Sequence, residues 1–244
     1  MSVLAGIRLG QVFGGVTALR DVDVAAVPGE VLGIIGPNGS GKSTLVDVLS
    51  GITRPQQGRV ELDGVDITNQ SAATRARSGI MRTFQTTRLM EPLTVRDNVM
   101  LGLHVSGLRG RQRRERVDAV LGTVGITGLA DVAVRELSHG QRRRVELGRA
   151  LAGGPDVLIL DEPTAGLFGP DAVEVCGLLR DAAAAGAAVV MVEHDLGIVG
   201  AVCTRLVALD GGEVVASGPT RPVLNSAVVA ALRGELGHDR AEAV

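Results

Sequence analysis

Aromatic residues and cysteines are scarce in this sequence. Its 244 residues include no Trp or Tyr, and the only aromatic side chains are Phe13, Phe84 and Phe168, each in or beside a motif described below. The two cysteines, Cys176 and Cys203, lie far apart and match no metal-binding or redox spacing. We therefore expect them to be reduced core residues of a cytosolic protein.

Long apolar runs, a targeting segment and a strong net charge are also absent. The longest apolar candidate, 182–192, is mostly alanine and falls short of the ~18 residues that a transmembrane helix requires. The N-terminus lacks a basic segment followed by an apolar stretch, so no signal peptide is expected. The formal net charge is −2, which argues against a general nucleic-acid-binding protein. The length suits one α/β core and is short for two nucleotide-binding domains.

The periodicity of apolar residues indicates antiparallel strands followed by a parallel α/β sheet. Residues 1–75 are mainly strands and turns, with a hairpin predicted at 59–67 around an Asp-Gly turn. Helical periodicity follows in three segments, at 95–103, 111–124 and 141–151. Strands and helices then alternate, with strands at 157–160, 187–192, 206–209 and 213–217, and helices at 171–184 and 195–203. Such alternation is typical of a parallel sheet.

A glycine-rich segment that can bind a triphosphate follows the apolar strand 31–35. Its residues are Gly36, Pro37, Asn38, Gly39, Ser40, Gly41, Lys42, Ser43 and Thr44. Glycines permit the backbone angles that turn successive N–H groups toward an anion, and the helix that follows adds its partial positive charge. Lys42 can reach the β- and γ-phosphates, and the Ser43 hydroxyl can coordinate Mg²⁺. The alternative is a glycine-rich turn that binds nothing.

Two acidic residues end the apolar strand 157–160. A carboxylate at the end of a strand in a phosphate-loop protein can hold the Mg²⁺ shell, and this suits Asp161. Glu162 comes one residue later and can orient or deprotonate an attacking water. The alternative is that the two acids cap the next helix.

A second helix N-terminus carries a serine and a glycine. The segment Leu137-Ser138-His139-Gly140-Gln141 leads into the helix predicted at 141–151, which makes either another anion site or an ordinary N-cap. Together with the phosphate loop and the paired acids, it resembles the L-S-G-G-Q signature motif of ATP-binding cassette (ABC) ATPases. His139 replaces the first glycine of that motif.

The resemblance extends over about residues 3–220 and implies roles for further residues. Phe13 matches the aromatic that stacks on adenine, with a core or hairpin Phe as the alternative. Gln85 matches the glutamine that touches Mg²⁺ or the water and couples to the transport subunits, and His194 matches the histidine that contacts the γ-phosphate. Residues 165–168 match the segment that crosses the dimer interface, where Phe168 replaces the usual Asp or Asn.

The family resemblance implies a fold and a mode of assembly. We expect one α/β P-loop NTPase domain of the ABC ATPase type over residues 1–233, followed by a polar tail at 234–244. It would combine a RecA-like core, an N-terminal antiparallel β subdomain and an α-helical subdomain inserted at about 86–150. ATP and Mg²⁺ would be its cofactors, and a second identical or homologous cassette would pair with it head to tail. Each signature motif, through Ser138, Gly140 and Gln141, would then close the partner's ATP site.

The resemblance also implies a role in transport. The chain would hydrolyse ATP at the cytoplasmic face of the cell membrane, as a peripheral subunit beside separate permease subunits and a solute-binding protein. The linkers around 82–85, 93–98 and 192–196 look most like those of branched-chain (hydrophobic) amino-acid uptake systems. The alternatives are a non-transport ABC ATPase of translation, repair or cofactor assembly, and a degenerate cassette that binds ATP without hydrolysing it. The transported solute is not encoded in this chain.

One segment is strongly basic. Its arginines are Arg109, Arg111, Arg113, Arg114 and Arg116. The segment is either a contact for a partner or an anionic lipid, or the solvated start of a helix whose nearby acids balance the charge.

Overall fold

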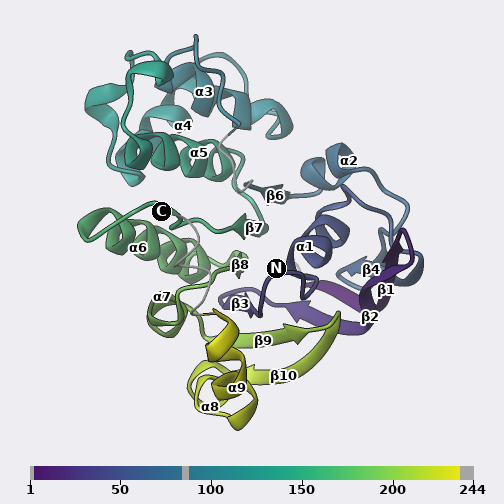
Figure 1. Cartoon of the computed structure of the whole chain (residues 1–244). Helices are drawn as coiled ribbons and strands as arrows, with labels where there is room; N and C mark the ends of the chain where they lie inside the picture. The colour runs from purple at the N-terminus through teal and green to yellow at the C-terminus, as the bar shows by residue number, and fades with distance from the viewer. Residues whose placement is uncertain (1–2, 84–87, 237–244) are drawn as a thin grey trace.

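The computed structural model describes residues 3–83 and 88–236, and these residues form two β-sheets with helices packed on them (Figure 1). Within those ranges, the antiparallel sheet has the strand order β2-β1-β4-β5. Its strands are β1 (Leu4–Phe13), β2 (Val16–Ala26), β4 (Gln57–Leu62) and β5 (Val65–Asp66). The predicted turn joins β4 to β5, with Asp63 and Gly64 both in the left-handed region at φ 53° and 77°. Two left-handed residues are what a tight hairpin turn requires.

The second sheet has the strand order β10-β9-β3-β8-β7-β6 in the described residues. Its strands are β3 (Val31–Ile35), β6 (Ile80–Arg82), β7 (Val157–Asp161), β8 (Ala188–Val192), β9 (Arg205–Asp210) and β10 (Glu213–Pro219). All neighbours pair in parallel except β9 and β10. The strands β3, β7 and β8 are buried along their whole length, because both faces of the sheet are covered.

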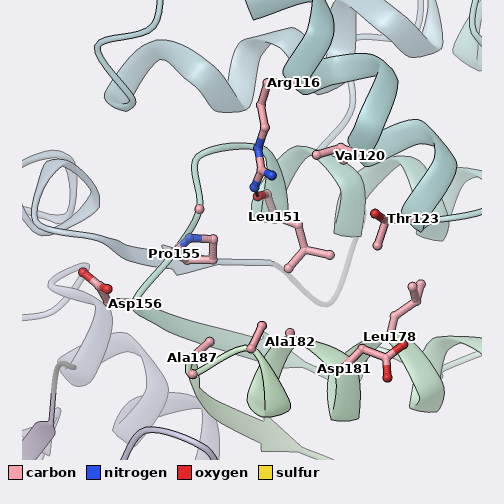
Figure 2. A pocket seen from close by; sticks show the side chains of 13 residues that line it. Arg116, Val120, Thr123, Leu151, Pro155, Asp156, Leu178, Asp181, Ala182 and Ala187 are labelled. Carbon is pink, nitrogen blue, oxygen red and sulfur yellow. Dashed lines mark hydrogen bonds between the residues drawn. The ribbon is translucent and has the colours of Figure 1, made fainter. Parts of the chain in front are cut away.

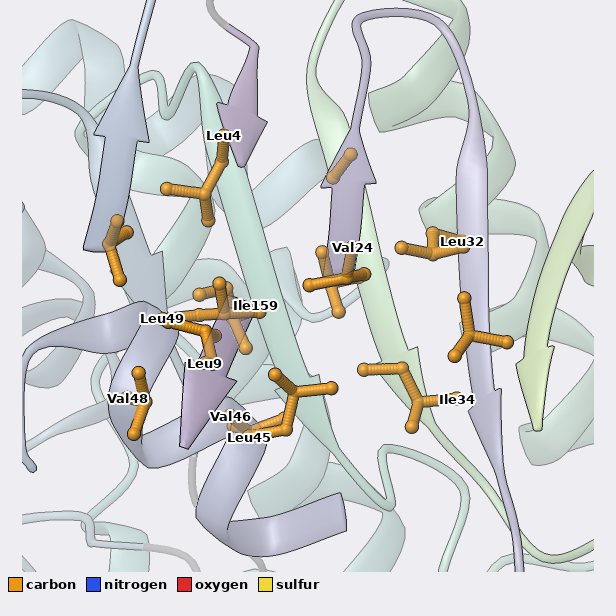
Figure 3. Close-up of a cluster of buried hydrophobic side chains, with 14 of the residues drawn as sticks. Leu4, Leu9, Val24, Leu32, Ile34, Leu45, Val46, Val48, Leu49 and Ile159 are labelled. Atoms are coloured by element: carbon orange, nitrogen blue, oxygen red, sulfur yellow. The ribbon is translucent and has the colours of Figure 1, made fainter. Parts of the chain in front are cut away.

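One face of the parallel sheet packs against α1 (Lys42–Ser50), which lies between the two sheets (Figures 1 and 3). Leu45 and Leu49 of this helix share a buried cluster with Leu9 of β1 and Ile159 of β7. The helix ends at Gly51, whose φ of 79° is the left-handed angle that commonly ends a helix. Burial of such side chains is worth about 1.5–3 kcal/mol each, and here it fixes the helix that follows the glycine-rich segment.

The other face of the parallel sheet is covered by α6 (Pro170–Ala184), α7 (Leu196–Val202), α8 (Thr220–Leu224) and α9 (Ala227–Leu236). The helices α6 and α7 confirm the predicted segments. The sequence analysis did not predict α8 and α9, nor α2 (Ala72–Arg77). The helix α9 continues past residue 234, where a polar tail was expected to begin.

The segment between β6 and β7 forms a helical layer with its own core (Figure 1). It contains α3 (Val95–Leu101), α4 (Gly110–Thr123) and α5 (His139–Ala152), joined by 3-10 turns at Gly102–Val105, Thr127–Leu129 and Val134–Glu136. Each helix lies within two residues of its predicted bounds. Leu147 and Ala150 of α5 also enter the core under the parallel sheet, so this helix joins the layer to the rest of the protein.

The basic segment at 109–116 begins α4, and two of its five arginines bind carbonyls of the helical layer while the other three are exposed. Arg113 donates to the carbonyl of Met100, and Arg116 donates to the carbonyl of Ala152. Arg111 pairs with Glu115 at 2.6 Å. These contacts favour the helix-start interpretation over a lipid or partner contact. In the described ranges, no helix has both the length and the apolar character needed to cross a bilayer.

Candidate nucleotide-binding site

The parallel sheet brings the predicted catalytic residues to one edge. The strands β3, β8 and β7 are neighbours and run in the same direction. The glycine-rich segment follows β3, the acids Asp161 and Glu162 lie at the end of β7, and His194 follows β8. Carboxyl ends of adjacent parallel strands form a crevice that is the usual binding site of α/β folds. Segments more than a hundred residues apart therefore share one site.

The glycine-rich segment has a backbone that only glycine fits at two positions. Gly36 has φ 151°, and a Cβ built there would lie 2.1 Å from the carbonyl oxygen of Leu209. Gly41 has φ 102°, and its Cβ would lie 2.3 Å from the carbonyl oxygen of Ala18. Both the torsion angle and the close approach of backbone thus exclude a side chain. The segment is a shaped loop, which argues against an incidental turn.

The loop continues directly into α1, whose N-terminus has no side-chain cap. The first N–H groups of such a helix have no partner within the helix and favour an anion. Lys42 opens the helix and is 6% exposed. Its Nζ donates to the carbonyls of Gly36 at 2.7 Å and Pro37 at 2.8 Å. The ammonium is therefore held over the loop, while Ser43 beside it is exposed.

A cavity of about 350 Å³ lies at this loop. Its lining comes from the loop, the start of β2 and the ends of β7 and β8: Val16, Thr17, Ala18, Asn38, Gly39, Gly41, Lys42, Ser43, Thr44, Glu162, Val192 and His194. The volume is in the range of small-molecule sites. The structure thus brings Lys42, Ser43, Glu162 and His194 together around one space. Sequence reasoning missed Val16, which reaches the cavity from the hairpin.

Phe13 lies at the end of β1 and is 50% exposed, so the core alternative for this residue is wrong. The hairpin that it begins continues into Val16 and Thr17, which line the cavity. An exposed aromatic next to a nucleotide cavity suits base stacking. Stacking on adenine stays a prediction, since Phe13 does not itself line the cavity.

Glu162 and His194 face each other across the ends of β7 and β8. Nε2 of His194 lies 2.8 Å from Oε1 of Glu162, and both side chains are partly buried. The N–H of Glu162 donates to the carbonyl of Val192 at 3.0 Å. Its φ is +48°, a left-handed angle that is uncommon for a residue with a side chain. Strained residues of this kind persist where surrounding contacts hold them, and they gather at functional sites.

Asp161 is 6% exposed and lies 3.4 Å from Nη2 of Arg82. Burial raises the pKa of its carboxyl; Arg82 opposes this shift, and Glu162 and Asp47 add to it. Arg82 also pairs with Asp47 and donates to the Ser50 hydroxyl at 3.0 Å, so it joins α1 to the end of β7. Sequence reasoning assigned Asp161 but missed this arginine.

The oxygens of Asp161 and Ser43 fit Mg²⁺, which prefers hard oxygen ligands. A buried carboxylate with two other acids near it is also one that a divalent cation would stabilise. Among the described residues, no group of three or more His, Cys, Asp or Glu side chains could hold a metal alone. Magnesium here would need phosphate oxygens as well, which is its usual mode of binding. Gln85, the other predicted metal-contacting residue, lies outside the described residues.

The signature-like segment caps α5. The N–H of Gln141 donates to Oγ of Ser138 at 3.3 Å, and the N–H of Ser138 donates to Oε1 of Gln141 at 2.9 Å. This reciprocal arrangement is a capping box. A Cβ built on Gly166 would lie 3.0 Å from the ring of His139, so the two segments with family departures are in contact. A role of Ser138, Gly140 and Gln141 in a partner's ATP site stays a prediction.

Glu193 completes a buried link that the sequence analysis missed. It is buried directly after β8, and it accepts a hydrogen bond from the Thr164 hydroxyl at 2.6 Å. It also accepts from the N–H of His194 at 3.0 Å. An acidic residue at the end of a wholly apolar strand is the sequence signal that could have identified it. The link ties the segment after β7 to the histidine after β8.

A cavity of about 460 Å³ lies elsewhere, between α4, the loop that precedes β7, and α6 (Figure 2). Val120, Leu151 and Leu178 project into it from three elements, with Arg116 and Asp181 beside them. The loop before β7 marks the amino end of that strand, whereas the phosphate loop lies at the carboxyl edge of the sheet. This second cavity is therefore separate from the candidate site.

Comparison with known proteins agrees with this geometry. The family model described as ABC transporter matches residues 19–165, which include the phosphate loop and both acids at the end of β7. The methionine import ATP-binding protein MetN 2 of Salmonella typhi is 38% identical over 204 residues, 82% of this chain and 60% of that protein. MetN 1 of Rhodococcus jostii is 37% identical over 220 residues, 89% of this chain and 65% of that protein. The chain therefore spans less than two thirds of these relatives.

Solved structures extend the likeness to nearly the whole chain. The ADP conformation of MJ1267, an ATP-binding cassette of an ABC transporter, has TM-score 0.88 and 32% identity, over 96% of this chain and 98% of that one. The dimeric structure of MJ0796, a bacterial ABC transporter cassette, has TM-score 0.81 and 28% identity, over 89% and 99%. Fold and site together define a P-loop NTPase of the ATP-binding cassette type. The chain belongs to the ABC transporter family, as one of its ATPase domains.

These comparisons confirm the predicted fold class, and the relatives they give differ in name from the transport system that the linkers had suggested. The two sheets and the inserted helical layer are those of an ABC ATPase domain. The curated relatives given above are methionine import proteins, whereas the linkers had suggested branched-chain amino-acid systems. The match to the family model includes the phosphate loop and the two acids. The linker segments suggested a different group of transporters from the relatives named above.

Proposed function

We propose that this chain is the Mg²⁺-dependent, ATP-hydrolysing subunit of an ABC importer. The observation that carries the proposal is the Glu162–His194 pair, 2.8 Å apart on the cavity that Lys42 and Ser43 also line. Hydrolysis needs a carboxylate that is oriented toward the phosphate-binding loop. Nucleotide binding alone does not need such a carboxylate. The degenerate cassette, which binds without turnover, is disfavoured for the same reason.

Each residue has a part in the proposed reaction. Backbone amides of the loop and the ammonium of Lys42 bind the phosphates, with the α1 N-terminus adding its dipole. Ser43 and Asp161 would hold Mg²⁺, which when bound neutralises charge on the phosphates. Glu162 accepts the proton of the attacking water, and the ring of His194 orients that carboxylate. Such general-base catalysis contributes about 10²–10⁴-fold in rate.

A second cassette is the proposed partner at the ATP site. The capped N-terminus of α5 offers Ser138, which is exposed, and Gln141, which is partly buried, on the helical layer. The dimeric structure of the similar cassette MJ0796 supports pairing of two cassettes, and we propose that they pair head to tail. If two chains form each site, specific ATPase activity of the purified chain rises with its concentration. A specific activity that does not change with concentration would contradict the dimer.

The proposed setting is the cytoplasmic face of the cell membrane, where the chain is a peripheral subunit beside separate permeases. A solute-binding protein would deliver the solute to the same complex. The names of the similar relatives, which are import ATP-binding proteins, support this setting. The rival is a non-transport ABC ATPase. Purification of the tagged chain from membranes decides between them, because only a transporter subunit brings a multi-helix permease with it.

The proposed solute is an apolar amino acid. Methionine is favoured by the relatives, and branched-chain amino acids are favoured by the linker motifs. The complex reconstituted with its permease and binding protein separates the two, because the correct solute raises ATP turnover. Stimulation by methionine alone, or by leucine, isoleucine and valine alone, identifies the class. Stimulation by none of them contradicts amino-acid import.

A further inference from the structure

Two consecutive arginines of α5 hold the segment that follows β7. Nη2 of Arg143 donates to the carbonyl oxygen of Glu162 at 2.8 Å. Nη2 of Arg144 lies 2.7 Å from Asp171, and its Nη1 lies 2.5 Å from Glu174, both on α6. The helix α5 therefore contacts this segment at two places, at the proposed general base Glu162 and at the start of α6.

Arg143 makes its contact from a buried ion pair. Its Nη1 lies 2.7 Å from Oε2 of Glu146, one turn further along α5, and the two side chains are 2% and 1% exposed. Removing two charges from water is expensive, and a buried pair is weak evidence for stability. A pair of apolar side chains would pack the same space without that expense. What the pair does provide is a guanidinium held in one orientation, directed at one carbonyl.

The carbonyl that Arg143 binds belongs to the strained residue of the site. Glu162 has φ +48°, its N–H is bound to Val192, and its carboxylate is bound to His194. Those two contacts come from Val192, the last residue of β8, and from His194, which follows that strand. The contact from Arg143 comes from the helical layer instead. A change in the position of α5 would therefore reorient the peptide of Glu162.

Arg143 and Arg144 are the polar ties described above between the helical layer and the segment after β7, beside the apolar packing of Leu147 and Leu167 in one buried cluster. Near the C-terminal end of α5, the cavity of Figure 2 lies between α4 and α6, with Leu151 and Leu178 on its walls. Close-packed interiors transmit displacement through continuous contact. At the N-terminal half of α5, Arg143 and Arg144 bridge the two parts directly.

We propose that Arg143 is a positioning residue for Glu162, and that it connects this general base to the signature-like segment on the same helix. The proposal rests on the proposed ATPase function. Gln141 lies two positions before Arg143 and Ser138 five positions before it, so the helix start is within about one and a half turns of Arg143. When the ATP of a second cassette binds at that start, the position of α5 sets the orientation of Glu162 in the first. The two ATP sites of a dimer would thereby be coupled.

Three variants test this. The double variant Arg143→Met, Glu146→Leu removes the contact to Glu162 without leaving a charge buried and unpaired. Arg143→Lys keeps the charge opposite Glu146 but lacks the guanidinium fork. The matched control is Arg75→Met: Arg75 is also fully buried and binds backbone carbonyls, including those of Val48 and Leu49, but it lies outside the nucleotide cavity.

We expect the double variant to lower kcat by about 10- to 100-fold, the scale on which small misplacements act. The Kd for ATP should change by less than about twofold, since Glu162 does not hold the nucleotide, and Arg143→Lys should retain intermediate activity. Arg75→Met should lower the Tm and leave kcat unchanged below the unfolding transition. A wild-type kcat in the folded double variant would overturn the proposal. If that variant does not fold, a wild-type kcat in Arg143→Lys overturns it, and a lowered kcat with normal Kd supports it.

A double-mutant cycle with Glu162→Gln separates positioning from a general structural effect. If Arg143 acts through the carboxylate, its replacement causes no further loss once the carboxylate has gone, because residues in contact are non-additive. An equal fold-loss in both backgrounds would overturn the proposal. Absence of ATP hydrolysis by the wild-type dimer would instead refute the proposed function and this inference with it. If the wild-type dimer hydrolyses ATP and the effects of the two substitutions are additive, the inference about Arg143 is refuted and the proposed function is not.

Discussion

His194 and Glu162 are joined by a contact of 2.8 Å between Nε2 and Oε1, although 32 positions separate them in the chain. The contact exists because β7 and β8 are adjacent, parallel and of equal length, so that their carboxyl ends coincide. A ring N–H that donates to the carboxylate limits the rotation of the Glu162 side chain. The pair therefore presents one oriented base to the phosphate cavity, and this arrangement leads to the first prediction.

Glu162→Gln should bind Mg-ATP almost normally and hydrolyse it about 10²–10⁴-fold more slowly. The amide keeps the size of the side chain but cannot accept the proton of water. Since hydrolysis would open the dimer, gel filtration with Mg-ATP should show an accumulated dimer. Glu115→Gln, on the exposed face of α4, is the control and should leave turnover unchanged. Turnover at the wild-type rate in Glu162→Gln would mean that another group is the base.

Lys42→Ala should lower ATP affinity by about 10- to 100-fold, because a charged hydrogen bond is worth about 1.5–3 kcal/mol. Turnover should fall to background, and Lys42→Arg should not restore it fully. Lys42 is the only lysine in the sequence, so acylation of a lysine side chain, read by peptide mapping apart from that of the α-amino group, reports on it directly. Mg-ATP should protect this amine from acylation. Unchanged labelling in saturating ATP would contradict a phosphate contact.

Phe13→Ala should weaken ATP binding by about 1–3 kcal/mol and leave kcat nearly constant. Stacking on adenine contributes equally before and during the reaction, because the base does not change as the phosphate reacts. Equilibrium titration with ATP and with a triphosphate that lacks a base separates the contributions. Phe168→Ala serves as the control for loss of an exposed phenyl ring, since Phe168 is 85% exposed and lies outside the cavity. An unchanged Kd for ATP would leave Phe13 as a hairpin residue only.

The two cysteines should be unreactive in the folded chain. Burial, with Glu193 adding to it, raises the pKa of Cys203 to about 12, and burial also raises the pKa of Cys176. At pH 8 both thiols stay protonated, and for Cys203 the reactive thiolate is on the order of 10³-fold scarcer than in a free cysteine. A thiol-directed reagent should therefore modify both groups only after denaturation. Rapid labelling of the native protein at pH 8 would contradict the buried positions.

Most of the nucleotide site was predictable because its determinants are local. Gly36, Lys42 and Ser43 follow one strand within a few residues, and a glycine backbone shapes its loop whatever the distant sequence is. Asp161 was predictable for a related reason, since the end of an apolar strand indicates which edge of the sheet it reaches. The helices α3 to α5 were found from their apolar period.

The supporting contacts were not predictable, because they depend on which segments meet. Arg82 reaches both α1 and β7, and Arg143 reaches a carbonyl beyond the helix that carries it. In the sequence they look like other arginines of a chain rich in them. Arg143 and Glu146 had one visible signal, since they occupy the buried face of α5 at a spacing of three residues. That signal alone does not say which atom they bind.

The ammonium of Lys42 rests on two carbonyl oxygens of its own loop, those of Gly36 and Pro37. A nucleotide that enters this loop meets a cation whose hydrogen bonds are already made, so it gains only the difference between old and new partners. If Lys42 binds phosphate as proposed, the same carbonyls would receive the ammonium again when phosphate leaves. Such an exchange of hydrogen-bond partners would preserve the conformation of the loop when no nucleotide is bound. It would also lower the affinity of the loop for any nucleotide. For an ATPase that must release its product in every cycle, carbonyl groups that can bind the ammonium again are more useful than tighter binding of the product.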